Sequence, residues 1–129
     1  MKNQIANRQA VFDYVKDKYG SEIEYLWARY PSFAIFRHND NNKWYGIVMD
    51  IPRAKLGLDS DEKVDILNVK CDDVLLKDML LQVDGYYPAY HQSKGKWITI
   101  LLDGTVPFED ICGFIDLSYK VTATKQKRS

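Results

Sequence analysis

The sequence predicts an α+β fold with two layers, in which an antiparallel sheet of about five strands carries helices on one face. Two observations lead to this prediction. Short segments rich in β-branched and aromatic residues are separated by turns and joined mostly as hairpins, which is typical of antiparallel sheets. Helical spacing of apolar residues occurs in few places, so the helices are expected to pack together on one side of the sheet.

The first half of the chain is predicted to form a helix and then strands. Apolar residues recur at helical spacing over about residues 7–19. Gly20 follows and can end the helix, because glycine enters the left-handed region without steric cost. Strands are expected over residues 22–27 and 33–37, with Pro31 separating them.

A hairpin is expected to join residues 33–37 to a strand over residues 43–51. The intervening residues 38–42 form a polar turn, since Asn and Asp side chains bond to their own backbone and tolerate positive φ. The alternation of the second strand places on one face Tyr45, Ile47, Met49 and Ile51, and on the other Trp44, Gly46, Val48 and Asp50.

The second half of the chain is predicted to form two strands and two helices. A strand covers residues 64–70, and Asp72 caps a helix that closes at Gly85. After a loop, a strand covers residues 97–102, and a last helix covers residues 107–119. The predicted order of elements is therefore α-β-β-β-β-α-β-α.

The chain length and charge limit the possible functions. The 129 residues suit one domain, residues 1–129, with a frayed basic tail over about residues 120–129. The 18 basic and 18 acidic side chains give a formal net charge of zero. This balance argues against a protein that mainly coats nucleic acid or anionic membrane, although it leaves room for a local basic patch.

Cysteines and apolar segments predict the compartment. Cys71 and Cys112 form no CxxC pair, and the chain starts without the basic and apolar regions of a secretory signal. We therefore expect a reduced, cytoplasmic protein. No apolar run approaches the roughly 18 residues that span a bilayer, so no membrane association is expected.

Six segments, taken together, resemble the YjbR/MmcQ family of bacterial proteins. In chain order they are EYLW (24–27), FAIFRH (33–38), KWYGIVMDI (43–51), LNVKCD (67–72), GYYPAYHQSKGKWITILLDG (85–104) and SY (118–119). The resemblance covers nearly the whole chain. It implies a two-layer α+β domain that binds DNA through a double wing, an arrangement of two hairpins.

One loop departs from the family pattern, in which Met-Asn-Lys and a second histidine stand between the first histidine and the tryptophan. His91, Lys94 and Trp97 match this pattern. Gln92, Ser93 and Lys96 do not match it, so a role that rests on the second histidine does not carry over.

The double-wing interpretation predicts a nucleic-acid site on two loops that project from the same end of the sheet. Cations would grip phosphates, and each stacked aromatic side chain would add roughly 1–3 kcal/mol. The candidate residues are Arg37, His38, Lys43, Trp44, Lys70, Tyr90, His91, Lys94, Lys96 and Trp97. In the alternative interpretation the lysines simply occupy turns and the aromatic residues fill a core.

Enzymatic and metal-dependent functions have little support in the sequence. His38 and His91, even with Cys71, lack the spacing by which zinc sites are recognised, and HExxH is absent. GxSxG, GxGxxG and Walker motifs are absent as well, so we expect no cofactor and no catalysis.

The other hypothesis is a protein-interaction domain, chaperone-like or dimerising, that uses an open face of the sheet. The side chains on that face distinguish the two hypotheses. Apolar side chains would favour a protein partner or homodimer, whereas lysines and arginines would favour nucleic acid.

Overall fold

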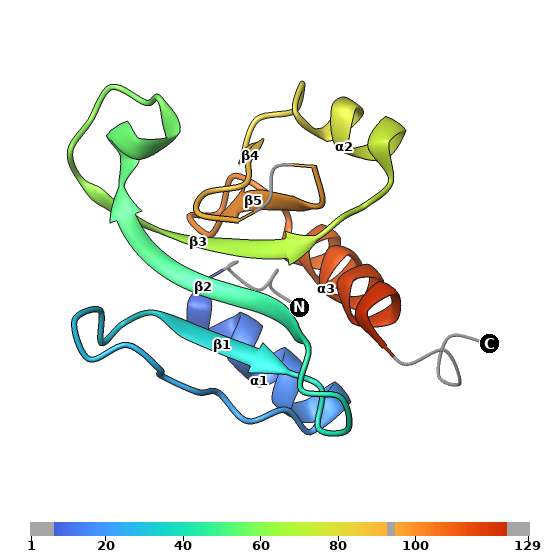
Figure 1. Ribbon diagram of the computed structural model, residues 1–129. Helices are drawn as coiled ribbons and strands as arrows, with labels where there is room; N and C mark the ends of the chain where they lie inside the picture. Colours follow the sequence, from blue (N-terminus) through green and yellow to red (C-terminus); the bar gives the residue numbers. More distant parts are fainter. Residues whose placement is uncertain (1–6, 93–94, 124–129) are drawn as a thin grey trace, which may run out of the picture.

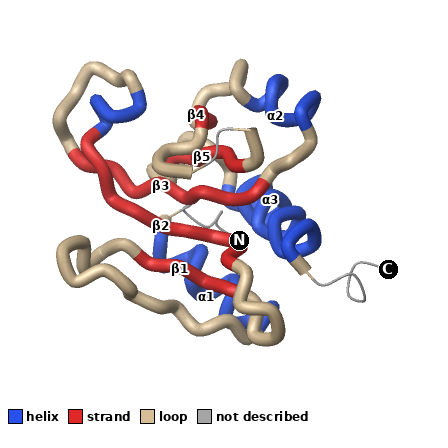
Figure 2. The backbone as a smooth tube through the Cα atoms, viewed as in Figure 1, coloured by secondary structure: helices blue, strands red, loops and turns tan. Residues whose placement is uncertain are grey.

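The structure is a computed structural model that describes residues 7–92 and 95–123, and it contains one five-stranded antiparallel sheet (Figure 1). The elements are α1 (Arg8–Tyr19), β1 (Ala34–Arg37), β2 (Trp44–Pro52), the 3-10 helix η1 (Arg53–Leu56), β3 (Lys63–Lys70), α2 (Val74–Leu80), β4 (Tyr86–Pro88), β5 (Trp97–Leu101) and α3 (Phe108–Thr122). The strands lie in the order β1-β2-β3-β5-β4, as Figure 2 shows. The predicted α+β class and the number of strands are confirmed.

One of the predicted strands is a different segment. Residues 22–27 form only an isolated bridge, in which the backbones of Glu24 and Ile35 exchange hydrogen bonds of 3.0 and 2.9 Å. The fifth strand is β4, which was predicted to be loop and which pairs with β5 at the edge of the sheet. Its three residues are too few for a visible alternation, and Pro88 fits only an edge strand because proline has no N–H to donate.

Helix boundaries agree with the predictions except at both ends of α2 and at the end of α3. α1 has the expected caps, with Asn7 Oδ1 accepting from the amide of Ala10 and Gly20 at a φ of 65°. α2 is capped by Asp73 rather than Asp72 and ends at Leu80, before Gly85. α3 continues through residues 120–122, which were predicted to belong to the frayed tail. The rest of that tail, residues 124–129, lies outside the described residues.

The alternation predicted for β2 holds from Gly46 to Ile51, but a β-bulge at the start of the strand makes it wrong for Trp44 and Tyr45. Phe36 pairs with Gly46 and Arg37 pairs with Trp44, so Tyr45 is an extra residue that turns to the opposite face. The Phe36 ring then lies over Gly46, where an added Cβ would be 1.9 Å from the ring. Glycine at this position is therefore required by the close packing.

The sheet carries a hydrophobic core on each face. On the helix side, residues of the strands pack against α1 and α3, with Leu76, Leu80 and Leu81 of the α2 region at its margin. The opposite core consists of Ile35, Ile47, Met49, Ile51, Val64, Ile66 and Leu101, each at most 6% exposed. It is covered by Trp27, Phe33, Trp44, Leu56, Tyr87, Tyr90 and Trp97. We call this covered, helix-free side the aromatic face; the open face expected from the sequence is thus not bare.

A carboxylate joins the two helices on the other side. Asp116 of α3 accepts hydrogen bonds from Tyr14 (2.8 Å), Tyr19 (2.6 Å) and Lys18 (2.9 Å) of α1. Burial alone would raise the pKa of Asp116, but these three donors outweigh it and lower the pKa. Tyr19 also stacks on Tyr119, with ring centroids 3.8 Å apart. The helix layer is therefore closed by both apolar and polar contacts.

Candidate binding site

The two loops that carry the predicted cations leave the same end of the sheet. β2 begins there with Trp44, and the pair of Lys70 with Trp97 places the end of β3 and the start of β5 at this end too. The β1–β2 turn and the β4–β5 loop therefore flank the end of β3 (Figure 1). This is the relative placement that a double wing needs.

Two of the candidate cations are engaged within the protein. Arg37 forms a bidentate ion pair with Glu24, with N–O distances of 2.7 and 2.8 Å. His38 is 1% exposed, its Nε2 lies 2.8 Å from Thr122 Oγ1, and its ring packs against Tyr119. His38 is therefore not part of the wing surface, and the charge of Arg37 is neutralised.

The other cations at this end are balanced by acids. Lys43 and Lys96 are exposed and Lys70 is half-buried, whereas Lys94 lies outside the described residues. In the same part of the structure, exposed carboxylates occur at Asp40, Asp72 and Asp73. The three described lysines at this end of the sheet are thus matched in number by the three aspartates of the β1–β2 turn and of the segment after β3, which leaves little attraction for a phosphate backbone.

The predicted stacking residues belong to the aromatic face rather than to the tips of the wings. Trp44, Tyr90 and Trp97 are half-buried and pack against the core of that face. Trp27 meets Trp44 edge to face, with ring centroids 5.7 Å apart. These contacts place the three aromatic candidates on the aromatic face.

A pocket of about 340 Å³ opens on the aromatic face. It lies above β2, between the loop before β1 and the loop after β4, and is lined by Trp27, Tyr30, Phe33, Ile47, Met49, Tyr90, His91 and Gln92. Tyr30 is 52% exposed and stacks on Phe33, with ring centroids 4.8 Å apart and an interplanar angle of 15°. The pocket therefore has aromatic walls, an aliphatic and thioether floor, and His91 and Gln92 as polar lining residues. We call it the aromatic pocket.

Two buried polar side chains fix one wall of the aromatic pocket. Asn68 Nδ2 donates to the carbonyl of Tyr90 (2.8 Å), and the amide of Tyr90 donates to Thr99 Oγ1 (2.9 Å). The Thr99 hydroxyl donates in turn to Asn68 Oδ1 at 2.5 Å, and neither side chain is exposed. Asn68 and Thr99 are polar residues within otherwise apolar strand segments. This pattern is visible in the sequence, but the prediction did not use it.

His91, the next residue, has an unusual backbone. Its φ is 60°, in the left-handed region that side chains other than glycine rarely adopt. Such a conformation costs about 1–3 kcal/mol and persists only where its surroundings enforce it, often at ligand sites. The His91 ring stands edge-on to Tyr90, 4.2 Å between centroids, so the strained residue lies in the wall of the aromatic pocket.

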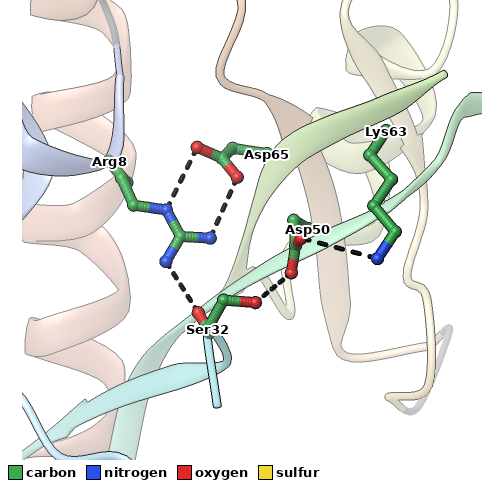
Figure 3. Close-up of polar contacts among 5 residues, drawn as sticks. All are labelled: Arg8, Ser32, Asp50, Lys63 and Asp65. Atoms are coloured by element: carbon green, nitrogen blue, oxygen red, sulfur yellow. Dashed lines mark hydrogen bonds and ion pairs between the residues drawn. The ribbon is translucent and has the colours of Figure 1, made fainter. Parts of the chain in front are cut away.

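Charged side chains anchor the loop that forms the other wall (Figure 3). Arg8 donates to both carboxylate oxygens of Asp65 (2.9 and 3.1 Å) and to the carbonyl of Ser32 (2.6 Å). The Ser32 hydroxyl bonds to Asp50, which also lies 3.9 Å from the ammonium of Lys63. Asp50 and Asp65 are directly opposite each other in the β2–β3 pair, a proximity that sequence spacing did not reveal.

The described residues contain neither a metal-binding cluster nor a membrane-spanning helix. Among residues 7–92 and 95–123, no group of three or more His, Cys, Asp or Glu side chains could hold a metal ion. His38 packs on the helix side of the sheet, whereas His91 lies on the aromatic face. Within the same ranges, none of the helices combines the length and the apolar character needed to cross a bilayer.

Comparison with known proteins gives consistent results. A model of the YjbR family matches residues 16–121. The uncharacterised protein YyaQ of Bacillus subtilis (strain 168) is 41% identical over 115 residues, which cover 89% of this chain and 97% of YyaQ. A crystal structure of a Pseudomonas syringae protein superposes with a TM-score of 0.87 at 40% identity, covering 91% of this chain and 99% of that one.

A more distant structure shares the fold alone. The crystal structure of the Deinococcus radiodurans protein DR2400, assigned to the domain family DUF419, superposes with a TM-score of 0.68. The two chains are 20% identical, and the match covers 96% of this chain and 86% of DR2400.

Proposed function

The chain belongs to the YjbR family, and we propose that it is a non-enzymatic binding domain whose binding site is the aromatic pocket. The observation that carries this proposal is the pocket itself. Trp27, Tyr30 and Phe33 from one loop face Tyr90 and His91 from another, and both loops are anchored by buried or bidentate polar contacts. Fixed aromatic walls of this kind suit a flat, unsaturated group of a ligand.

The first candidate ligand is a base of single-stranded nucleic acid. Every base offers a face for stacking, worth about 1–3 kcal/mol for each base stacked on an aromatic side chain. Arg29 is exposed next to the pocket residue Tyr30, and its guanidinium would meet a neighbouring phosphate. A duplex has its bases already stacked, so it would bind more weakly than a single strand.

The second candidate ligand is an aromatic side chain of another protein. The floor of the aromatic pocket, Ile47 and Met49, is uncharged, which favours an apolar partner. Nucleic acid and protein ligands differ in salt dependence: contact with about two phosphates would give a slope of about −1.4 in a plot of log affinity against log salt. An uncharged peptide ligand would show almost no slope.

A fluorescence titration tests both candidates. Trp27 in the pocket wall should be quenched by a single-stranded oligonucleotide but not by an abasic strand of equal length. Tyr30→Ala should reduce the affinity about tenfold, the equivalent of one lost stacking contact. Tyr25→Ala is the matched control, because Tyr25 lies in the same loop, is 55% exposed and does not line the pocket.

The outcomes separate the candidates. Equal binding of the abasic strand, or equal losses from Tyr30→Ala and Tyr25→Ala, would exclude stacking in the aromatic pocket. A change in tryptophan fluorescence on addition of N-acetyl-phenylalaninamide, without quenching by the oligonucleotide, would favour the protein ligand.

A further inference from the structure

The surface of α2 and the turn after it exposes a group of large apolar side chains. Val74 is 61% exposed, Leu75 77%, Met79 68% and Val83 52%. We call these four residues the α2 patch. Leu75 and Met79 are one helical turn apart, so they lie on the same side of α2. Apolar groups gathered in this way on a protein surface often mark a contact with another protein.

The α2 patch is exposed although α2 is held against the molecule. Leu76, Leu80 and Leu81 are partly buried against the helix-side core, and Asp73 Oδ1 caps the helix by accepting from the amide of Leu76. Lys77, on the inner side, is 7% exposed. α2 therefore has one face that packs on the core and one that packs on nothing within the described structure.

The α2 patch continues into a hollow of about 280 Å³. Residues 81–88 line this hollow, so Val83 belongs both to the patch and to the rim of the hollow. The residues that line the hollow run from the end of α2 to β4, which is the edge strand of the sheet. A helix lying across α2 could place one apolar side chain in this hollow, as anchor residues do in many interfaces.

The charges around the α2 patch select the partner. Exposed carboxylates occur at Asp72, Asp73, Asp78 and Asp84, and the lysine within this segment, Lys77, is buried. A symmetric pair of two copies through α2 would bring these carboxylates together, which is unfavourable. An anionic membrane surface is repelled for the same reason. A cationic partner is attracted.

We propose that the α2 patch docks an amphipathic helix of a partner protein, in which apolar side chains are flanked by lysine or arginine. The apolar side chains cover Leu75, Met79 and Val83, and the cations pair with Asp78 and Asp84. This site is separate from the aromatic pocket and does not depend on the function proposed for that pocket.

The probe for this proposal is a synthetic amphipathic helical peptide with a leucine face and lysine flanks. The expected result, in two-dimensional amide NMR of the full chain, is a set of chemical-shift changes within residues 74–88. A peptide with glutamate in place of each lysine should cause none. Equal binding of the two peptides, no binding of the lysine peptide, or shifts centred elsewhere would overturn the proposal.

Variants separate docking from nonspecific attraction. Asp78→Lys combined with Asp84→Lys should weaken binding of the lysine peptide about tenfold, as expected for the loss of two ion pairs and their reversal. Asp59→Lys combined with Asp61→Lys makes the same change of charge at exposed residues of another loop and should leave the affinity nearly unchanged. Equal effects of the two pairs would overturn the proposal.

A third variant tests the apolar contact. Leu75→Ser combined with Met79→Ser should abolish binding while the melting temperature stays unchanged, because both side chains are exposed. Sedimentation of the parent chain is the control for self-association. A dimer that disappears in this variant would identify a second copy as the occupant and overturn the proposal.

Discussion

The two faces of the sheet are buried to the same extent but are covered by different means. On the helix side, α1 and α3 close the core, and Asp116 ties them together through three donors. On the aromatic face, strand residues such as Ile47 and Ile66 are equally inaccessible, yet their cover comes from separate side chains of loops, strands and η1 rather than from an α-helix. The aromatic face contains the pocket of about 340 Å³ lined with aromatic side chains.

The hollows on the two sides differ in what lines them. The helix side has a hollow of about 450 Å³ lined by α1 and by Phe108 of α3, without strand residues, whereas Ile47 and Met49 of β2 line the aromatic pocket. In this protein the loops are held in place by Asn68 and Thr99 on one side and by Arg8 and Asp65 on the other. The pocket is therefore preformed rather than made by a mobile lid.

The largest expected effect on stability comes from removing a large side chain that covers the core of the aromatic face. Trp97 begins β5 and packs on that core, so Trp97→Ala should lower the free energy of unfolding by about 3–5 kcal/mol, as for other large aromatic truncations. Thermal and denaturant unfolding would measure this. If the variant melts like the parent, Trp97 is a surface residue and the face is less well packed than described.

A smaller effect is expected from the anchor of the pocket wall. Asn68→Ala removes the partner of the Tyr90 carbonyl and of Thr99, so unfolding should become easier by about 1–3 kcal/mol. Quenching of Trp27 by ligand should weaken as well. Asn39→Ala, at an exposed turn position, is the control and should change neither quantity. A loss of stability with unchanged ligand binding would show that the Tyr90 wall is not part of the site.

The helix side should be recognised by its dependence on pH. Although burial opposes it, hydrogen bonds from Tyr19, Lys18 and Tyr14 hold the pKa of Asp116 below its usual value. A lowered pKa adds stability that is fully present above the unfolded value of about 4 and is lost as the pH falls through the folded value.

Substitution of this carboxylate gives the corresponding test. Asp116→Asn should be about 1 kcal/mol less stable than the parent near neutral pH, allowing for its partly exposed position. The difference should shrink as the pH falls below about 4, in urea titrations at several pH values. A difference that stays constant through the acid range would mean that the charge of Asp116 is not what joins the helices.

The smallest effect on stability is expected at the wings. Lys43→Glu combined with Lys96→Glu changes exposed side chains, so the melting temperature should stay the same within error. Oligonucleotide affinity should fall less than it does in Tyr30→Ala. A larger fall in affinity, with a marked change in its salt dependence, would show that nucleic acid binds at the wings rather than in the aromatic pocket.

The sequence predicted the class and most elements because these depend on local patterns. Apolar spacing located α1 and α3, and the polar turn 38–42 located the β1–β2 hairpin. β4 was missed because three residues ending in Pro88 show no alternation. The bulge at Tyr45 was missed because it belongs to the pairing of two strands rather than to either strand alone.

The candidate site was predicted less well because it depends on contacts between distant residues. His38 is buried by Thr122, which is 84 positions away along the chain, and no local signal reveals this. The double-wing interpretation named Tyr90 and His91, which line the aromatic pocket, but could not include Trp27 or Tyr30. Their loop meets the β4–β5 loop only because both fold over β2.

The central claim, that ligands bind in the aromatic pocket, can be tested by amide NMR of the chain titrated with a single-stranded oligonucleotide. The account predicts that the largest chemical-shift changes fall in residues 27–33 and 90–92, the two loops of the pocket. Changes confined to the turn 38–43, or to the exposed side of α1 and α3, would contradict it.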